Sequence, residues 1–323
     1  MLRTRLTDRF ALEHPVILAP MAFAAGGALA GAVSRAGGLG LIGGGYGDPD
    51  WLRSELERAG DARVGCGFIT WSLAQAPALL DLVLGHRPAA LLLSFGDPRP
   101  FAKRIHDAGV PLLCQVQDRE MARAALAAGA AVLVAQGTAA GGHGATRSTI
   151  TLVPEIVDLC AKEHPDTLVV AAGGIADGRG LAAALMLGAD GVLMGSRFWA
   201  TREASVPTGF HAAAIAASAD DTLRTRVVDI VRAKAWPAPF TARVLRNRFV
   251  ARWHGQEEEL RAKAHEELPG YTRAWNQGDA EGTGVFVGEA ASFIGSVPPA
   301  GTLLRSIVED ACGHLAAGAA RVR

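Results

Sequence analysis

The chain has 323 residues, of which 50% are hydrophobic and 20% are charged, a composition that supplies a large apolar core and is not typical of a disordered chain. Lys and Arg total 32, as do Asp and Glu, and this zero net charge argues against nucleic acid or an anionic membrane as the main partner. The length allows either one large barrel or two domains of ordinary size.

The cysteines and the N-terminal segment indicate a reducing compartment. Cys66, Cys114, Cys160 and Cys312 are widely spaced and form no CxxC pair, which disfavours a disulfide framework or a zinc site. Residues 1–15 lack the apolar run of a signal peptide, and no apolar stretch reaches the ~20 residues of a membrane span. We therefore expect a soluble, cytoplasmic protein that holds no metal ion.

Short apolar segments recur in the first two thirds of the chain. Most are continuously hydrophobic, as strands buried on both faces are; they span residues 16–19, 39–42, 64–69, 90–94, 111–114, 131–135, 168–172 and 191–194. Helical segments alternate with them, and several end at a glycine suited to the left-handed C′ position: Gly37, Gly109, Gly129 and Gly188. Eight alternations favour an α/β fold with a closed (β/α)₈ TIM barrel over a doubly wound sheet. Two stacked three-layer domains are the alternative, although residues 1–200 contain no linker between them.

The pattern changes after the eighth segment. Residues 206–284 have helical periodicity without a clear strand, and they contain Trp236, Trp253, Trp275 and a charged run that is typical of a solvated helix face. Helical periodicity returns at 301–317, which we interpret as the last outer helix. The sequence therefore predicts a barrel formed by residues 1–205 and 285–323. A smaller, mainly helical insertion domain, residues 206–284, precedes the last barrel helix and covers the active site.

One glycine motif is excluded as a nucleotide site. Gly38, Gly40 and Gly43 match GxGxxG, but a dinucleotide fingerprint follows a strand and opens a helix. Here the motif is itself the predicted second strand, and a helix precedes it. We therefore do not interpret it as a Rossmann site.

Two other glycine clusters predict a phosphate site. Gly173-Gly174 follows the seventh strand, and Gly195-Ser196 follows the eighth. TIM barrels often bind phosphate in these two loops, where backbone N–H groups face the anion, and glycine removes side chains that would block those groups. The Ser196 hydroxyl adds a donor. Two ordinary strand-to-helix turns are the alternative interpretation.

His143 is the candidate catalytic residue. It stands in a glycine-rich segment after the sixth strand, with Gln136 at the strand end. A lone histidine is usually structural, but apolar burial does not explain one in a flexible glycine loop on the catalytic face of a barrel. Such an imidazole binds an anionic substrate or moves a proton. The other histidines lack a comparable setting.

These motifs, EHPVILAPM, AQGTAAGGHGA, AAGGIADGRG and LMGSRF in this order, resemble the nitronate monooxygenase (2-nitropropane dioxygenase-like) flavoproteins. The resemblance covers nearly the whole chain and includes ARVLRNRF and FVGEAASFIG. It implies an oxidoreductase with a TIM barrel, a helical lid and non-covalent FMN, in which His143 is the active-site histidine. The implied FMN contacts are Ala19, Pro20, Met21, Gly67, Gln115, Gln136, Gly141, Gly142, Gly173, Gly174, Leu193, Met194, Gly195 and Ser196.

Two positions depart from the family pattern. Gly67 stands where the family often has Asn, and Ala140 and its preceding neighbours supply no acidic residue where the family often has one. Both departures bear on the substrate more than on the flavin.

The resemblance implies oxidation of alkyl nitronates with O₂ to carbonyl compounds and nitrite. The negative nitronate oxygens would lie near His143, which could also act as base towards a neutral nitroalkane. Two alternatives stay open: an NAD(P)H-dependent quinone or enoyl-thioester reductase on the same barrel, and a flavin- or phosphate-binding barrel without turnover. The expected partners are a small nitronate or quinone-like substrate and O₂, and the sequence leaves a homodimer open.

Overall fold

The computed structural model describes residues 2–322, and its larger part is built around a parallel eight-stranded sheet. The strands follow the order β1-β9-β8-β6-β5-β4-β3-β2, and a parallel bridge between Ile17 and Leu39 joins β1 to the segment leading into β2. The sheet therefore closes into a barrel, which confirms the predicted fold and its eight strands. Their bounds are β1 Val16–Leu18, β2 Leu41–Gly43, β3 Gly65–Ile69, β4 Leu91–Ser94, β5 Leu112–Val116, β6 Val132–Gln136, β8 Leu168–Ala172 and β9 Gly191–Met194.

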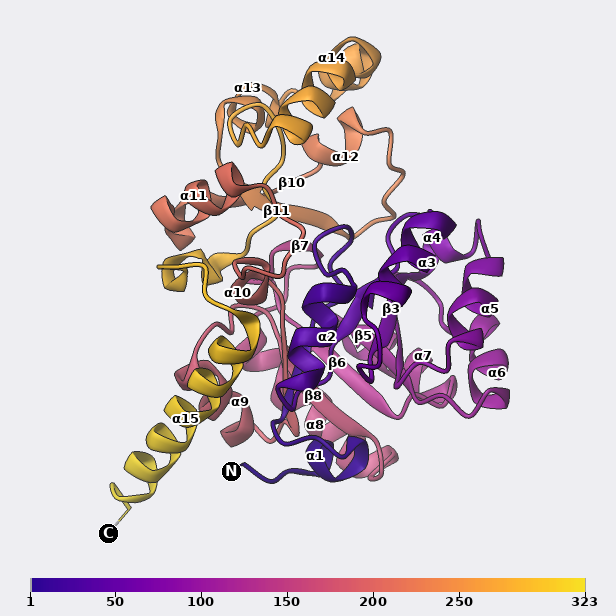
Figure 1. Cartoon of the computed structure of the whole chain (residues 1–323), viewed down its shortest axis with the longest axis vertical. Coiled ribbons are helices and arrows are strands. Elements are labelled where there is room, and N and C mark those ends of the chain that lie inside the picture. The colour runs from indigo at the N-terminus through magenta and orange to yellow at the C-terminus, as the bar shows by residue number, and fades with distance from the viewer. Residues whose placement is uncertain (1, 323) are drawn as a thin grey trace.

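Helices surround the barrel (Figure 1). They are α2 (Gly27–Arg35), α3 (Pro49–Arg58), α4 (Thr70–Leu73), α5 (Ala78–Gly85), α6 (Arg99–Asp107), α7 (Arg119–Ala127), α8 (Thr149–Glu163), α9 (Gly178–Met186), α10 (Ser196–Trp199) and α15 (Ala300–Ala319). The last of them, α15, packs against α9 and α2, so it completes the ring as predicted. The four glycines expected to end helices all have positive φ, between 69° and 91°.

The strands separate two apolar layers. Side chains that point inward, such as Ile17, Leu113 and Leu193, form one cluster that also includes Leu6 and Phe10 of α1 (Arg5–Phe10). Helix α1 thereby closes the end of the barrel opposite the insertion, as Figure 1 shows. Side chains that point outward pack against the surrounding helices, because successive residues of a strand face opposite sides.

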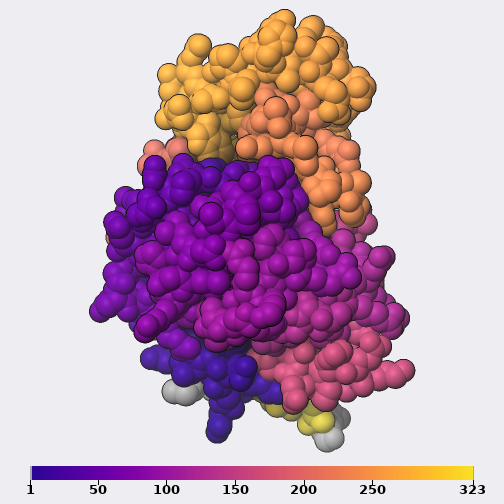
Figure 2. Space-filling view, turned by 90° about the vertical axis from the view of Figure 1, so that its right-hand side faces the viewer, coloured from indigo at the N-terminus to yellow at the C-terminus, as the bar shows by residue number. Residues whose placement is uncertain are grey.

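Residues 206–284, which we call the insertion, lie above the barrel in Figures 1 and 2. Their helices are α11 (Thr208–Ala216), α12 (Val227–Val231), α13 (Arg248–Trp253) and α14 (Glu257–Gln277), with a short 3₁₀ turn, η1 (Ala219–Asp221). A second 3₁₀ segment, η2 (Glu289–Phe293), follows the insertion. Within the described part of the chain, no helix is long and apolar enough to cross a membrane.

The expectation that the insertion contains no clear strand is wrong. Strands β10 (Thr222–Thr225) and β11 (Thr241–Leu245) pair antiparallel, and β11 also pairs with β7 (Gly142–Gly144) from the loop after β6. The first four residues of β11 alternate between partly exposed and buried, but the strand is short and its partners are distant in sequence. Because this sheet takes one strand from the barrel loops, the exact boundary between the two predicted domains stays a prediction.

Candidate active site

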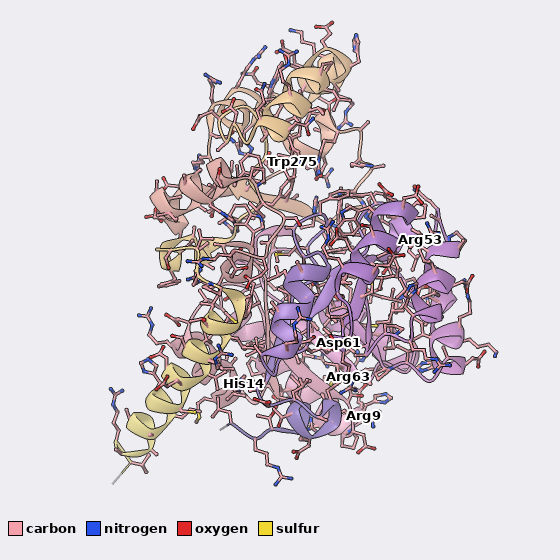
Figure 3. All side chains as sticks on the ribbon, in the orientation of Figure 1. Arg9, His14, Arg53, Asp61, Arg63 and Trp275 are labelled. Carbon is pink, nitrogen blue, oxygen red and sulfur yellow. The ribbon has the colours of Figure 1, made fainter. Side chains whose placement is uncertain are left out.

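A cavity of about 400 Å³ lies between the loops at the carboxyl ends of the barrel strands and the insertion. Its wall is mostly apolar, and its upper part is formed by insertion residues such as Phe210, Arg232, Trp236 and Trp275. Figure 3 labels Trp275 where the insertion faces the barrel, whereas His14 lies towards the opposite end. Trp253, which we grouped with these tryptophans by sequence, is instead buried in the insertion's own core.

All but one of the residues predicted to form the site line this cavity. They are Ala19, Pro20, Met21, Gly67, Gln115, Gln136, Gly141, Gly142, His143, Gly173, Gly174, Leu193, Gly195 and Ser196. The exception is Met194, whose side chain packs in the layer between the strands and the helices. Leu193 faces the barrel interior, and the next residue of the strand must point the other way.

The glycines after β8 and β9 form a cradle of backbone donors. Gly173 and Gly174 have φ of 102° and 77°, and a Cβ at Gly173 would lie 2.7 Å from the Gly137 carbonyl oxygen, so glycine is required there. Among residues 2–322, the backbone N–H groups of Gly174, Gly195 and Ser196 have no acceptor. Unpaired donors at a cavity wall suit an anion such as phosphate.

The Ser196 hydroxyl and the Gln136 amide add donors to this wall. Ser196 Oγ accepts a hydrogen bond of 2.9 Å from the Gly288 N–H, which leaves its own O–H free to donate. Gln136 Oε1 accepts from Gln115 Nε2 at 3.1 Å and from Gln117 Nε2 at 2.9 Å. Both lone pairs of the Gln136 carbonyl are thus occupied, and its N–H₂ group is the end left for a ligand. Gln117, which is buried, was not predicted from the sequence.

His143 is not held in a flexible loop, as we expected, but in a buried strand. It lies in β7 opposite Ala242 of β11 and is only 8% exposed. Its Nε2 lies 3.0 Å and 2.9 Å from the two carboxylate oxygens of Asp229, and its ring stacks on Trp236. The flanking glycines allow the loop to join the sheet of the insertion, and this pairing fixes the imidazole.

The Asp229 contact determines which ring nitrogen of His143 carries the hydrogen and which carries the lone pair. An ionised carboxylate only accepts hydrogen bonds, so Nε2 carries the hydrogen and donates. Burial lowers the pKa of His143, and the Asp229 carboxylate opposes part of that shift. The ring is therefore neutral near pH 7, and Nδ1, which has no partner in the described chain, is an acceptor. This arrangement suits a general base.

Asp229 and Arg232 are the functional candidates that the sequence analysis missed. Asp229 lies in α12 and is 4% exposed, and Arg232 Nη2 donates to its Oδ1 at 2.9 Å. The segment VVDIVR places an acid and a base one helical turn apart inside an apolar run, which is a signal for a buried ion pair. Nothing in that local pattern connects the pair to His143, which is distant in sequence.

Comparisons with known proteins agree with this architecture. A family model described as nitronate monooxygenase matches residues 3–63 and 72–310. A nitronate monooxygenase of Metarhizium robertsii is 36% identical, over 92% of this chain and 90% of its own length. A (3aS,4S,5R,7aS)-5-hydroxy-7a-methyl-1-oxo-octahydro-1H-indene-4-carboxyl-CoA dehydrogenase of Mycobacterium tuberculosis is 29% identical over 99% of both chains.

Two solved structures extend the comparison. FabK from Thermotoga maritima has a TM-score of 0.89 and 32% identity, with both chains covered completely. A nitroalkane oxidase from Streptomyces ansochromogenes has a TM-score of 0.82 and 28% identity, covering 97% of this chain and 99% of its own.

Proposed function

This chain belongs to the nitronate monooxygenase family and is an oxidoreductase; from that premise we propose that it oxidises alkyl nitronates with O₂ to carbonyl compounds and nitrite, using FMN. The observation that carries the proposal is the setting of His143: Asp229 binds its Nε2, and its Nδ1 is left without a partner among residues 2–322, in a largely apolar cavity beside a donor-lined wall. A base in this position suits a substrate that can lose a carbon-bound proton, as a nitroalkane does.

The residues present fit FMN. The N–H groups of Gly174, Gly195 and Ser196 would hold the phosphate, and the Ser196 hydroxyl would assist them. The Gln136 N–H₂ group and Gln115 would contact the flavin, with Ala19, Pro20 and Met21 beside the ring. Bound FMN would supply the electron chemistry, which protein side chains do not provide.

The protein's own groups would bind and orient the substrate and move one proton. His143 Nδ1 takes the proton from the carbon of a neutral nitroalkane, and Asp229 keeps the opposite nitrogen protonated so that Nδ1 is available. A preformed nitronate needs no proton removal. The insertion covers the cavity with Trp236 and Trp275, which excludes water and strengthens the polar contacts inside.

A reductase is the second candidate function. FabK aligns with 100% of this chain and the CoA dehydrogenase with 99%. Proteins similar to this chain over its length therefore include some that are not named nitronate monooxygenases. In this second candidate, NADH or NADPH would reduce the flavin, and a quinone or an enoyl thioester would accept the electrons. A flavin- or phosphate-binding barrel without turnover is disfavoured, because the chain belongs to a family of enzymes.

The test is to purify the protein, identify its chromophore by mass spectrometry, and mix it anaerobically with propyl-1-nitronate, NADH or NADPH. We expect the nitronate to bleach the flavin absorbance, and we expect nitrite to form when oxygen is admitted. Bleaching by NADH or NADPH alone, with no nitrite from the nitronate, would contradict the proposal and favour the reductase.

A further inference from the structure

The neutral His143 leaves the negative charge of a nitronate without a partner. Its Nε2–H is used by Asp229, and its Nδ1 presents a lone pair, which repels an anionic oxygen rather than binding it. With this tautomer the ring offers the nitronate oxygens no free N–H group. Another donor has to hold them.

We propose that Arg232 binds the anionic oxygens of the substrate, so that the cavity selects small organic anions. The inference rests on the proposed function for the identity of the anion as a nitronate. The roles are then divided between two side chains: Arg232 holds the charged end, and the Nδ1 of His143 faces the carbon that loses the proton.

The hydrogen bonds of Arg232 leave one end of its guanidinium free. Nε donates to the Val228 carbonyl oxygen at 2.7 Å, and Nη2 donates to Asp229 Oδ1 at 2.9 Å. Nη1 has no acceptor among residues 2–322. Arg232 lines the cavity, and its side chain is only 21% exposed. A largely buried guanidinium with unused donors is poorly satisfied unless a ligand or water accepts from it.

Aromatic rings hold the guanidinium in place. Its central carbon lies 5.0 Å from the centroid of the Phe286 ring and 5.9 Å from that of Tyr46, and such cation–π contacts fix its orientation. The Tyr46 oxygen accepts from Trp236 Nε1 at 3.2 Å. Burial raises the pKa of Tyr46, so its hydroxyl keeps a proton and offers a second donor beside Arg232.

The charges of the cavity wall favour an anion. Of the described residues that line it, Arg232 is the only Arg or Lys, and none is Asp or Glu. Asp229, which partly balances Arg232, is shared with His143 through both of its oxygens. In an apolar cavity a charge-assisted hydrogen bond is stronger than in water, so one guanidinium is enough to discriminate an anion from a neutral analogue.

The test uses a ligand that binds without turnover. Butyrate has the chain length, the planar end and the charge of propyl-1-nitronate, and butyramide is its neutral counterpart. We expect calorimetry on the flavin-loaded protein to show butyrate binding and much weaker butyramide binding. Arg232→Gln should weaken butyrate roughly 10- to 100-fold, the range for one hydrogen bond to a charged group, and should retain FMN.

Two further variants serve as controls. Lys234→Gln removes the same charge two residues away, where the ammonium lies over Tyr46 at 4.7 Å but outside the cavity lining, and it should bind butyrate normally. If Arg232→Gln does not fold, Asp229→Asn/Arg232→Gln leaves no unpaired buried charge. It should bind butyrate more weakly than Asp229→Asn alone, since the Asn acts on His143 equally in both variants.

Several results would overturn the proposal: no butyrate binding by the wild type, unchanged binding in the Arg232 variants, an equal loss in Lys234→Gln, or loss of FMN from Arg232→Gln. None of these requires turnover. A wild type that binds butyrate through Arg232 but does not oxidise nitronates would contradict the proposed function and leave the anion site intact.

Discussion

The indole of Trp236 lies parallel to the imidazole of His143, with the ring centroids 3.4 Å apart and the planes inclined by 5°. His143 comes from a barrel loop and Trp236 from the insertion, so this contact connects the two parts at the candidate base. The indole covers one face of the imidazole and excludes water from it. This contact contributes to the burial that lowers the pKa of His143.

Replacing Trp236 by Ala should therefore raise the pKa of His143. Water reaches the uncovered ring, the charged form is better solvated, and the base is protonated at a higher pH than in the wild type. The acidic limb of the pH profile of kcat/KM for a nitroalkane should move to higher pH, while the profile for a nitronate should show no such shift.

The control for this variant is Trp253→Phe. Trp253 is buried in the insertion's core and does not line the cavity, so its replacement should lower the melting temperature without moving the limb. An acidic limb that stays in place or moves to lower pH in Trp236→Ala would show that the indole does not set the pKa of His143.

Replacing His143 by Asn tests the base directly. The amide cannot take a proton at neutral pH, so activity on nitroalkanes should fall by roughly 10²–10⁴-fold, the usual contribution of a general base. Activity on preformed nitronates should fall less, and FMN should stay bound because its phosphate is held by other loops. Equal losses on both substrates would mean that His143 only orients the substrate, and no loss on either would make it structural.

Replacing Asp229 by Asn tests whether this carboxylate positions His143. The Asn amide can donate to Nε2, which would then carry the lone pair and leave the hydrogen on Nδ1. The base would be lost from the cavity side, so nitroalkane activity should fall by up to about 10²–10⁴-fold, and nitronate activity should fall less. Asp220→Asn, an exposed acid in the same insertion, is the matched control. Unchanged nitroalkane activity in a folded Asp229→Asn protein would exclude the positioning role.

The barrel could be predicted from the sequence because its signals are local. A barrel strand that is buried on both faces has a continuous apolar sequence, as residues 168–172 do. Glycines such as Gly188 mark the ends of the helices. The glycines after β8 and β9 are also a local signal, because the loops after the last two strands of a TIM barrel often bind phosphate.

The sequence predicts that the insertion covers the active site, but the contacts of its residues with the barrel could not be predicted because their signals are not local. Asp229, Arg232 and Trp236 acquire their roles only when β11 pairs with β7 and brings the insertion to His143. β11 has only five residues and its strand partners are distant in sequence, so tertiary pairing rather than propensity decides its structure. The burial of His143 followed from the same pairing and was missed with it.

The last prediction concerns the cradle for the phosphate. A Cβ at Gly195 would lie 3.6 Å from Ala19 Cβ and from Met21 Sδ, which is ordinary contact, so a small side chain fits there without rearranging the barrel. Gly195→Ala should therefore retain FMN, whereas Gly195→Asp places a negative charge beside the unpaired N–H groups of Gly195 and Ser196 and should repel the phosphate. We expect Gly195→Asp to be folded by circular dichroism and to contain little flavin, measured as the ratio of visible to ultraviolet absorbance. Full flavin content in Gly195→Asp would place the phosphate elsewhere, and equal flavin loss in Gly195→Ala would point to steric exclusion rather than charge.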